Sequence, residues 1–359
     1  MEKLCSIQDV GIYLSVDHEM RKNILRNRLM EQLDGFDSYY RNTAEIERII
    51  VKDLQELQIP QNSIVVPQNA YYFPDGTFYS LEAKIAFQMC DVGMTFWCDE
   101  NVWYLPYMLQ YLLEAKQRTF LHGAGIAVNG TDGYLLVAFG GIGKTCFVAN
   151  AIKQDNVKLL GDDLIIAGAD GTLRSYPRPF CLYPYHKTLF PQFFDGKKLH
   201  FEEVRTDRYF LRASRKLKKK LHIPDSIIYD YLPVSPIHLF PQEKVQVEPV
   251  RVKKVFVLRR VVGLTGLQIR PATDLDGIAS FAHSVIQHEW SIGIRLEFNY
   301  LAHQEHDYGD MANAQYQTIR NCLKHAEEFY YVDIPENMQA ERVSLELNKV
   351  ILGGQKCED

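Results

Sequence analysis

The chain has few cysteines, and they form no pattern that holds a metal or a disulfide framework. Its 359 residues include seven, an odd number, and no two have CxxC spacing. They are Cys5, Cys90, Cys98, Cys146, Cys181, Cys322 and Cys357. This scatter argues against a structural zinc site or a disulfide scaffold, and it suits a reducing cytoplasm.

Long hydrophobic runs are also missing. No stretch approaches the length of a membrane span, and the start, Met1 to Ser6, lacks a basic region followed by an apolar run. The net charge of −5 is unlike that of a general nucleic-acid binder. We therefore expect a cytoplasmic protein with no membrane and no nucleic-acid partner. The composition leaves a homo-oligomer open.

The length allows two domains. Residues 1–119 mix helical and strand periods, which predicts an α+β accessory domain. Helices are expected over 18–33, 44–57 and 105–116, and strands over 63–67 and 70–79 with a turn at Asp75-Gly76. The middle helix rests on apolar residues at helical spacing, with Thr43 as its N-cap. These are Ile46, Ile49, Ile50, Leu54 and Leu57.

The chain's clearest motif is Ala138-Phe-Gly-Gly-Ile-Gly-Lys-Thr145. It fits the phosphate-binding loop, with Ala138 in place of the usual first glycine. An apolar strand pattern precedes it and a helical pattern follows. The alternative is a glycine-rich turn without a ligand. The nucleotide-binding residues expected are Gly140, Gly141, Ile142, Gly143, Lys144, Thr145 and Cys146.

Such a loop holds ATP by pointing backbone N–H groups at the phosphates, beside the positive end of the next helix. Lys144 would reach the outer phosphates, and the Thr145 hydroxyl would bind Mg²⁺.

An acidic pair follows shortly after the loop. Asp162 and Asp163 come after an apolar run that reads as a short strand, 157–161. In an open α/β sheet, ligands bind beyond the carboxyl ends of strands, so the pair is expected near the loop. One carboxylate could accept a proton from an attacking hydroxyl while the other, Asp163 in our assignment, holds Mg²⁺ with Thr145. The alternative is a solvated turn.

Upstream of the loop, His122-Gly123 lies in a predicted strand, 121–128, and a turn at 129–133 leads into the loop strand. His122-Gly123, the loop with Lys144 and Thr145, and the strand ending in the acidic pair resemble the catalytic domain of HPr kinase/phosphorylase. The resemblance covers roughly residues 120–175. That family's core is similar to the nucleotide site of phosphoenolpyruvate carboxykinases.

The resemblance implies an α/β fold in which residues 120–359 form a P-loop, HPr-kinase-like catalytic domain. It implies ATP- and Mg²⁺-dependent phosphorylation of a serine hydroxyl, with catalytic residues His122, Lys144, Asp162 and Asp163. One Asp acts as the base, and His122 couples to it. Which Asp is the base stays open.

Two departures refine the resemblance. Cys146 stands where the bifunctional HPr enzymes usually carry Glu, and their later glycine-rich signature segment has no counterpart. The better match is the looser group of HPr-kinase-like serine kinases, some of which phosphorylate lasso-peptide precursors. The expected partner is thus a small protein or precursor peptide bearing a serine. A small-molecule hydroxyl and a non-catalytic ATP-binding regulator are the alternatives.

The rest of the chain offers weaker signals. Residues 176–187 combine prolines and aromatics with Arg178 and His186, which suits either a substrate loop or a rigid connection. Residues 205–220 are strongly basic and suit a solvated surface or a contact with an acidic acceptor. A strand is expected over 253–260, ending in two arginines. Helices are expected near 274–290 and 311–328.

Overall fold

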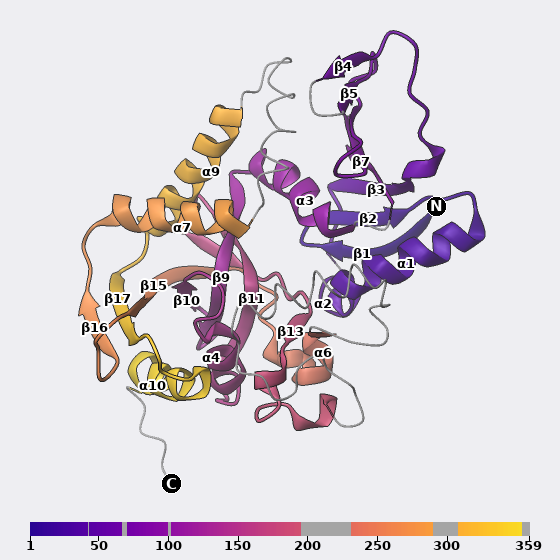
Figure 1. Ribbon diagram of the computed structural model, residues 1–359. Coiled ribbons are helices and arrows are strands. Elements are labelled where there is room, and N and C mark those ends of the chain that lie inside the picture. Colours follow the sequence, from indigo (N-terminus) through magenta and orange to yellow (C-terminus); the bar gives the residue numbers. More distant parts are fainter. Residues whose placement is uncertain (42, 67–69, 100–101, 195–230, 290–307, 354–359) are drawn as a thin grey trace.

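The computed structural model describes residues 1–41, 43–66, 70–99, 102–194, 231–289 and 308–353. Two main sheets, one of eight strands and one of seven, combine with helices into a mixed α/β structure, as the sequence predicts (Figure 1). No helix within these ranges is long and apolar enough to cross a membrane. The basic segment 205–220 lies outside the described residues.

The first sheet has the strand order β1-β2-β3-β8-β7-β6-β5-β4. Its strands are β1 (Glu2–Ile7), β2 (Val10–Leu14), β3 (Glu47–Asp53), β4 (Ile64–Val66), β5 (Ala70–Tyr72), β6 (Phe78–Ser80), β7 (Ile85–Cys90) and β8 (Gly93–Cys98). Its helices are α1 (Glu19–Leu33) and α2 (Phe36–Tyr40). We call this sheet with α1 and α2 the N-terminal unit. The helix predicted over 18–33 and the turn at Asp75-Gly76 are confirmed.

The helix predicted over 44–57 is wrong. Its residues form strand β3 and a 3₁₀ turn, Leu54–Glu56. In β3 burial alternates with period two, so that Ile49 and Val51 are fully buried. β3 lies between β2 and β8, and this pairing outweighs helical spacing.

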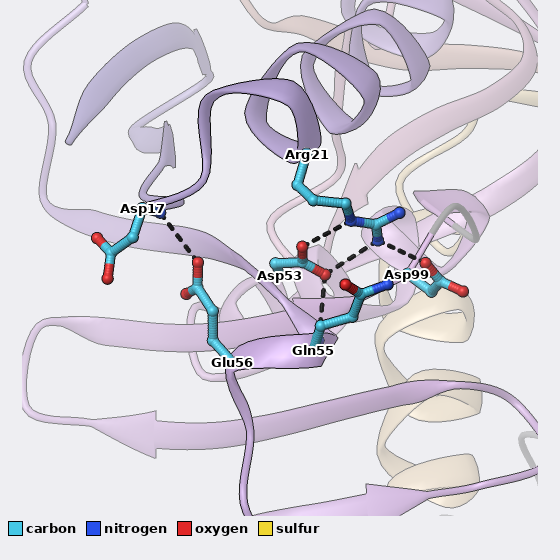
Figure 2. A network of polar contacts seen from close by, with 6 residues as sticks. All are labelled: Asp17, Arg21, Asp53, Gln55, Glu56 and Asp99. Carbon is cyan, nitrogen blue, oxygen red and sulfur yellow. Dashed lines mark hydrogen bonds and ion pairs between the residues drawn. The ribbon is translucent and has the colours of Figure 1, made fainter.

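A partly buried ion-pair network fixes the end of β3 to α1 (Figure 2). The Arg21 guanidinium donates two hydrogen bonds to Asp53, at 2.7 and 3.0 Å, and one to Asp99 at 2.6 Å. The Asp53 carboxylate also accepts a hydrogen bond from the backbone N–H of Gln55, and the Glu56 carboxylate accepts one from the backbone N–H of Asp17. Because the Asp53 side chain is only 2% exposed, its charge depends on Arg21 for compensation.

The second sheet has the order β10-β9-β11-β12-β15-β17-β16. Its strands are β9 (Arg118–Val128), β10 (Asp132–Val137), β11 (Val157–Gly168), β12 (Thr172–Arg174), β15 (Val250–Val261), β16 (Gln268–Pro271) and β17 (Glu328–Pro335). β10 also pairs with β15, so the first five strands of this order close into a ring.

Helices pack on both sides of this sheet (Figure 1). They are α3 (Leu105–Glu114), α4 (Lys144–Ala151), α7 (Leu275–Glu289), α9 (Tyr308–Leu323) and α10 (Ala340–Leu352). α10 packs on α4, while α7 and α9 pack on each other and on β9. The helices near 105–116 and 274–290 are confirmed. The last predicted helix extends too far, because residues from Glu328 onward pair with β15 as β17.

Short elements connect β12 to β15. They are β13 (Phe180–Leu182), paired with β14 (Leu232–Val234), the helix α6 (Pro236–Leu239), and 3₁₀ turns at Pro184–His186, Pro191–Phe193 and Gln242–Lys244. Another 3₁₀ turn, Val102–Tyr104, precedes α3. One continuous buried core runs through both sheets. The division into domains 1–119 and 120–359 therefore separates two sheets that share packing, and it stays an interpretation.

Candidate functional site

The glycine-rich loop joins the end of β10 to the start of α4. Gly141 and Gly143 have φ of +77° and +100°, in the left-handed region that favours glycine. Gly143 is the residue before α4, so the free N–H groups of that helix face the loop. The Lys144 ammonium folds back and donates to the carbonyls of Ala138, at 2.8 Å, and Phe139, at 3.0 Å. A cation and a helix N-terminus therefore meet at one loop, which suits an anion.

Strands β10, β9 and β11 place the glycine-rich loop beside His122-Gly123 and the acidic pair. Val137 at the end of β10 is opposite Gly123 of β9, which is opposite Asp163 of β11. A Cβ on Gly123 would lie 2.5 Å from the Leu136 carbonyl oxygen, so only glycine fits this approach. The His122-Gly123 pair and the acidic pair are thereby held beside the loop.

The acidic pair lies inside a strand rather than at the end of one, which corrects the expectation. β11 continues past both residues to Gly168. The strand is irregular here: its register with β9 shifts between Leu159 and Gly161, and Asp163 has φ of +83°. Successive side chains of a strand point to opposite faces, so the two adjacent carboxylates reach partners on different elements.

Asp162 belongs to the loop side of the site. Its Oδ2 accepts a hydrogen bond of 2.8 Å from the Thr145 hydroxyl, and the residue is buried at 7% exposure. Burial raises the pKa of Asp162 to about 6, and the neighbouring Asp163 charge adds to this rise. The expectation paired Thr145 with Asp163. In the structure the Thr145 hydroxyl contacts Asp162 instead.

Asp163 faces the open side, with 46% of its side chain exposed. Arg178 donates to its Oδ2 at 3.0 Å, and His122 Nδ1 lies 3.4 Å from its Oδ1. Burial favours a higher pKa for Asp163, but Arg178, His122 and Lys144 together outweigh it and lower that pKa. The Asp163 carboxylate is therefore ionised at neutral pH.

His122 is only 4% exposed, and burial lowers its pKa to about 4 against the opposing charge of Asp163. Its ring is thus neutral at pH 7. Beside an ionised carboxylate, a neutral imidazole acts as an orienting group rather than as half of an ion pair.

Arg178 is a site residue that sequence reasoning identified only as part of a proline-rich segment. Pro177 and Pro179 flank it and keep the chain extended. Its amide donates to the Tyr176 carbonyl at 2.8 Å. The flanking prolines were the available signal, but the pairing with Asp163 depends on a turn of the chain that no local pattern encodes.

Three further residues make contacts within the fold. Cys146 is fully buried in α4, and burial raises the pKa of its thiol to about 12. Its carbonyl accepts a bond from Ser344 of α10. At the end of β15, Arg259 pairs with Asp333. Arg260 donates to the carbonyls of Pro335 and Met338, so it holds the chain that leads into α10.

The part of the chain that the structure describes contains no group of three or more His, Cys, Asp or Glu side chains placed to hold a metal. The pair Thr145 and Asp162 nevertheless offers two hard oxygen atoms, 2.8 Å apart, beside the glycine-rich loop. Mg²⁺ is usually held by one or two protein oxygens together with substrate phosphates and water, so this donor pair fits it.

No family model matches the chain, and no curated protein matches it.

Proposed function

We propose that this chain is an ATP-dependent kinase of the HPr-kinase-like type that phosphorylates a serine hydroxyl on a small protein or precursor peptide. One observation carries the proposal. The two adjacent carboxylates have different environments: Asp162 is buried against Thr145, and Asp163 is half-exposed and ionised. A kinase needs such a division between a metal ligand and a group that receives the acceptor's proton.

On the nucleotide side, the backbone N–H groups of the loop and of the N-terminus of α4 donate hydrogen bonds to the phosphates of ATP. Lys144 exchanges its two loop carbonyls for the outer phosphates. Thr145 and Asp162 would hold Mg²⁺, which when bound neutralises charge on the β- and γ-phosphates. The raised pKa of Asp162 reflects a carboxylate whose negative charge has little compensation before a cation binds.

On the acceptor side, the Asp163 carboxylate receives the proton of the attacking hydroxyl. The hydroxyl oxygen forms the new bond to the γ-phosphorus, the bond from that phosphorus to the bridging oxygen breaks, and ADP leaves. Phosphoryl transfer requires little early proton removal, so a carboxylate of low pKa suffices if it is well oriented. Arg178 and His122 supply that orientation.

The alternative functions differ in what they require. A regulator that only binds ATP needs no exposed carboxylate fixed by an arginine and a histidine, so these contacts favour catalysis. A small-molecule kinase would need the same machinery with another acceptor. The acceptor class therefore has to be tested directly.

The experiment is incubation with MgATP and a panel of acceptors, followed by mass spectrometry for an added phosphoryl group. The panel contains serine peptides, the same peptides with serine changed to alanine, and small polyols. Asp163→Asn, which keeps the side-chain shape, is the catalytic control. Transfer to serine peptides alone supports the proposal, and transfer to polyols alone favours a small-molecule kinase. ATP binding without transfer to any acceptor would identify a regulator.

A further inference from the structure

The segment that carries Arg178 is held from the N-terminal unit. The Tyr40 hydroxyl of α2 donates to the Ser175 carbonyl at 2.9 Å and also contacts the Ser175 hydroxyl. Gln8, which follows β1, donates to the same carbonyl at 3.1 Å and to the Tyr40 hydroxyl at 2.9 Å. Tyr40 and Ser175 are 2% and 0% exposed. Since water does not replace these bonds, the network fixes the chain three residues before Arg178.

Aromatic packing holds the next residue. The Tyr176 ring lies edge-to-face between Phe36 of α2, with centroids 5.1 Å apart, and Phe120 of β9, at 4.9 Å. The Tyr176 amide donates to the Leu160 carbonyl of β11. Contacts from the N-terminal unit and from the second sheet thus converge two residues before Arg178.

We propose that the N-terminal unit is a working part of the site, and that Tyr40 is a positioning residue that sets Arg178 against Asp163. This inference rests on the proposed function, because it takes Asp163 as the group that receives the acceptor's proton. The contacts form one chain, in which α2 holds residues 175 and 176, these place Arg178, and Arg178 orients the carboxylate. The first sheet is then required for turnover and is not a separate accessory module.

A double-mutant cycle with a matched control tests the proposal. Tyr40→Phe removes one hydroxyl and keeps the ring. Tyr39→Phe makes the same change on the same helix, where the hydroxyl has no hydrogen bond to any residue that the structure describes. Tyr40→Phe should lower kcat about 10-fold with KM for ATP unchanged, because small displacements of orienting groups reduce rates steeply. Tyr39→Phe should leave kcat unchanged.

Variants of Arg178 test whether the loss of kcat in Tyr40→Phe is transmitted through Arg178. Arg178→Gln should lower kcat about 100-fold, and Arg178→Lys should recover part of that loss. Because Tyr40 acts through Arg178, the double variant Tyr40→Phe with Arg178→Gln should be no slower than Arg178→Gln alone. A further 10-fold loss of kcat in the double variant would show that Tyr40 acts independently of Arg178, for example through the general fold. That result would overturn the proposal.

Hydrogen exchange separates this inference from the proposed function, since it needs no activity. In Tyr40→Phe the amides of Tyr176 and Arg178 should exchange about 10-fold faster than in the unmodified protein, with the loop amides 140–145 unchanged. Tyr39→Phe should show no difference. Unchanged exchange in Tyr40→Phe would refute the link even in an active enzyme. If these amides exchange faster in Tyr40→Phe but even the unmodified protein transfers no phosphoryl group, the link to Arg178 stands and the role of Asp163 is refuted.

Discussion

Asp163 has a backbone conformation that suits glycine better than aspartate. Its φ of +83° places it in the left-handed region, which costs a residue with a side chain about 1–2 kcal/mol. Glycine avoids this cost but loses about 0.5–1 kcal/mol through its greater freedom in the unfolded chain. Asp163→Gly should therefore be more stable than Asp163→Ala by about 1 kcal/mol, although both lose the same carboxylate.

The neighbouring residue supplies the control, because Asp162 is absent from the residues with positive φ. There Asp162→Gly should be less stable than Asp162→Ala by about 0.5–1 kcal/mol, the opposite sign. Urea unfolding of the four variants, with midpoints compared at a common slope, measures both differences.

The reasoning fails if Asp163→Gly proves equal to or less stable than Asp163→Ala. Activity should behave differently from stability. Both Asp163 variants should lose about 10²–10⁴-fold in kcat whatever their stability. If Asp163→Gly is more stable than Asp163→Ala but equally inactive, the strained backbone at residue 163 is retained because it positions the Asp163 carboxylate.

Three further predictions concern single groups. Lys144→Ala should abolish turnover while circular dichroism stays unchanged, and transfer at the normal rate would refute the loop assignment. Arg21→Met should destabilise the fold by about 3–5 kcal/mol in urea unfolding, because it leaves the buried Asp53 charge unpaired, whereas a loss below about 1 kcal/mol would show that Asp53 is compensated otherwise. The pKa of Asp162, about 6 in the fold, lies above its usual value near 4, so its contribution to stability is complete below about pH 4 and is lost as pH rises through 6. Without Mg²⁺, the unmodified protein should thus lose about 2 kcal/mol relative to Asp162→Asn between pH 4 and 7, and parallel pH curves would contradict this.

Much of the site could be predicted because its signals are local. The glycines that need positive φ, the lysine and threonine after them, and the hairpin before them are adjacent in sequence, and the structure has β10, the loop and α4 in that order. The two carboxylates were identified for the same reason.

Sequence reasoning failed where a partner lies far along the chain. The apolar residues of 46–57 fit one helix face, while Ile49 and Val51 fit one face of a strand, and only pairing with β2 and β8 decides between the two. The partner of Thr145 depends on which face of β11 each carboxylate occupies, and the structure turns Asp162 toward α4. Arg178 was missed as a partner of Asp163 because their contact depends on the chain's return after β12.

The closed ring of strands has a consequence for the order in which the site can assemble. β10, which leads into the glycine-rich loop, pairs on one edge with β9 directly before it. Its other edge pairs with β15, so that Asp132 meets Arg251. During synthesis, which runs from the N-terminus, this second edge stays open until β15 emerges, and α10 covers α4 later still. Contacts so distant in sequence form slowly, so nucleotide binding should appear late in folding, well after the N-terminal unit. If the proposed function holds, ATP would bind only the completed loop and would favour this last step of folding.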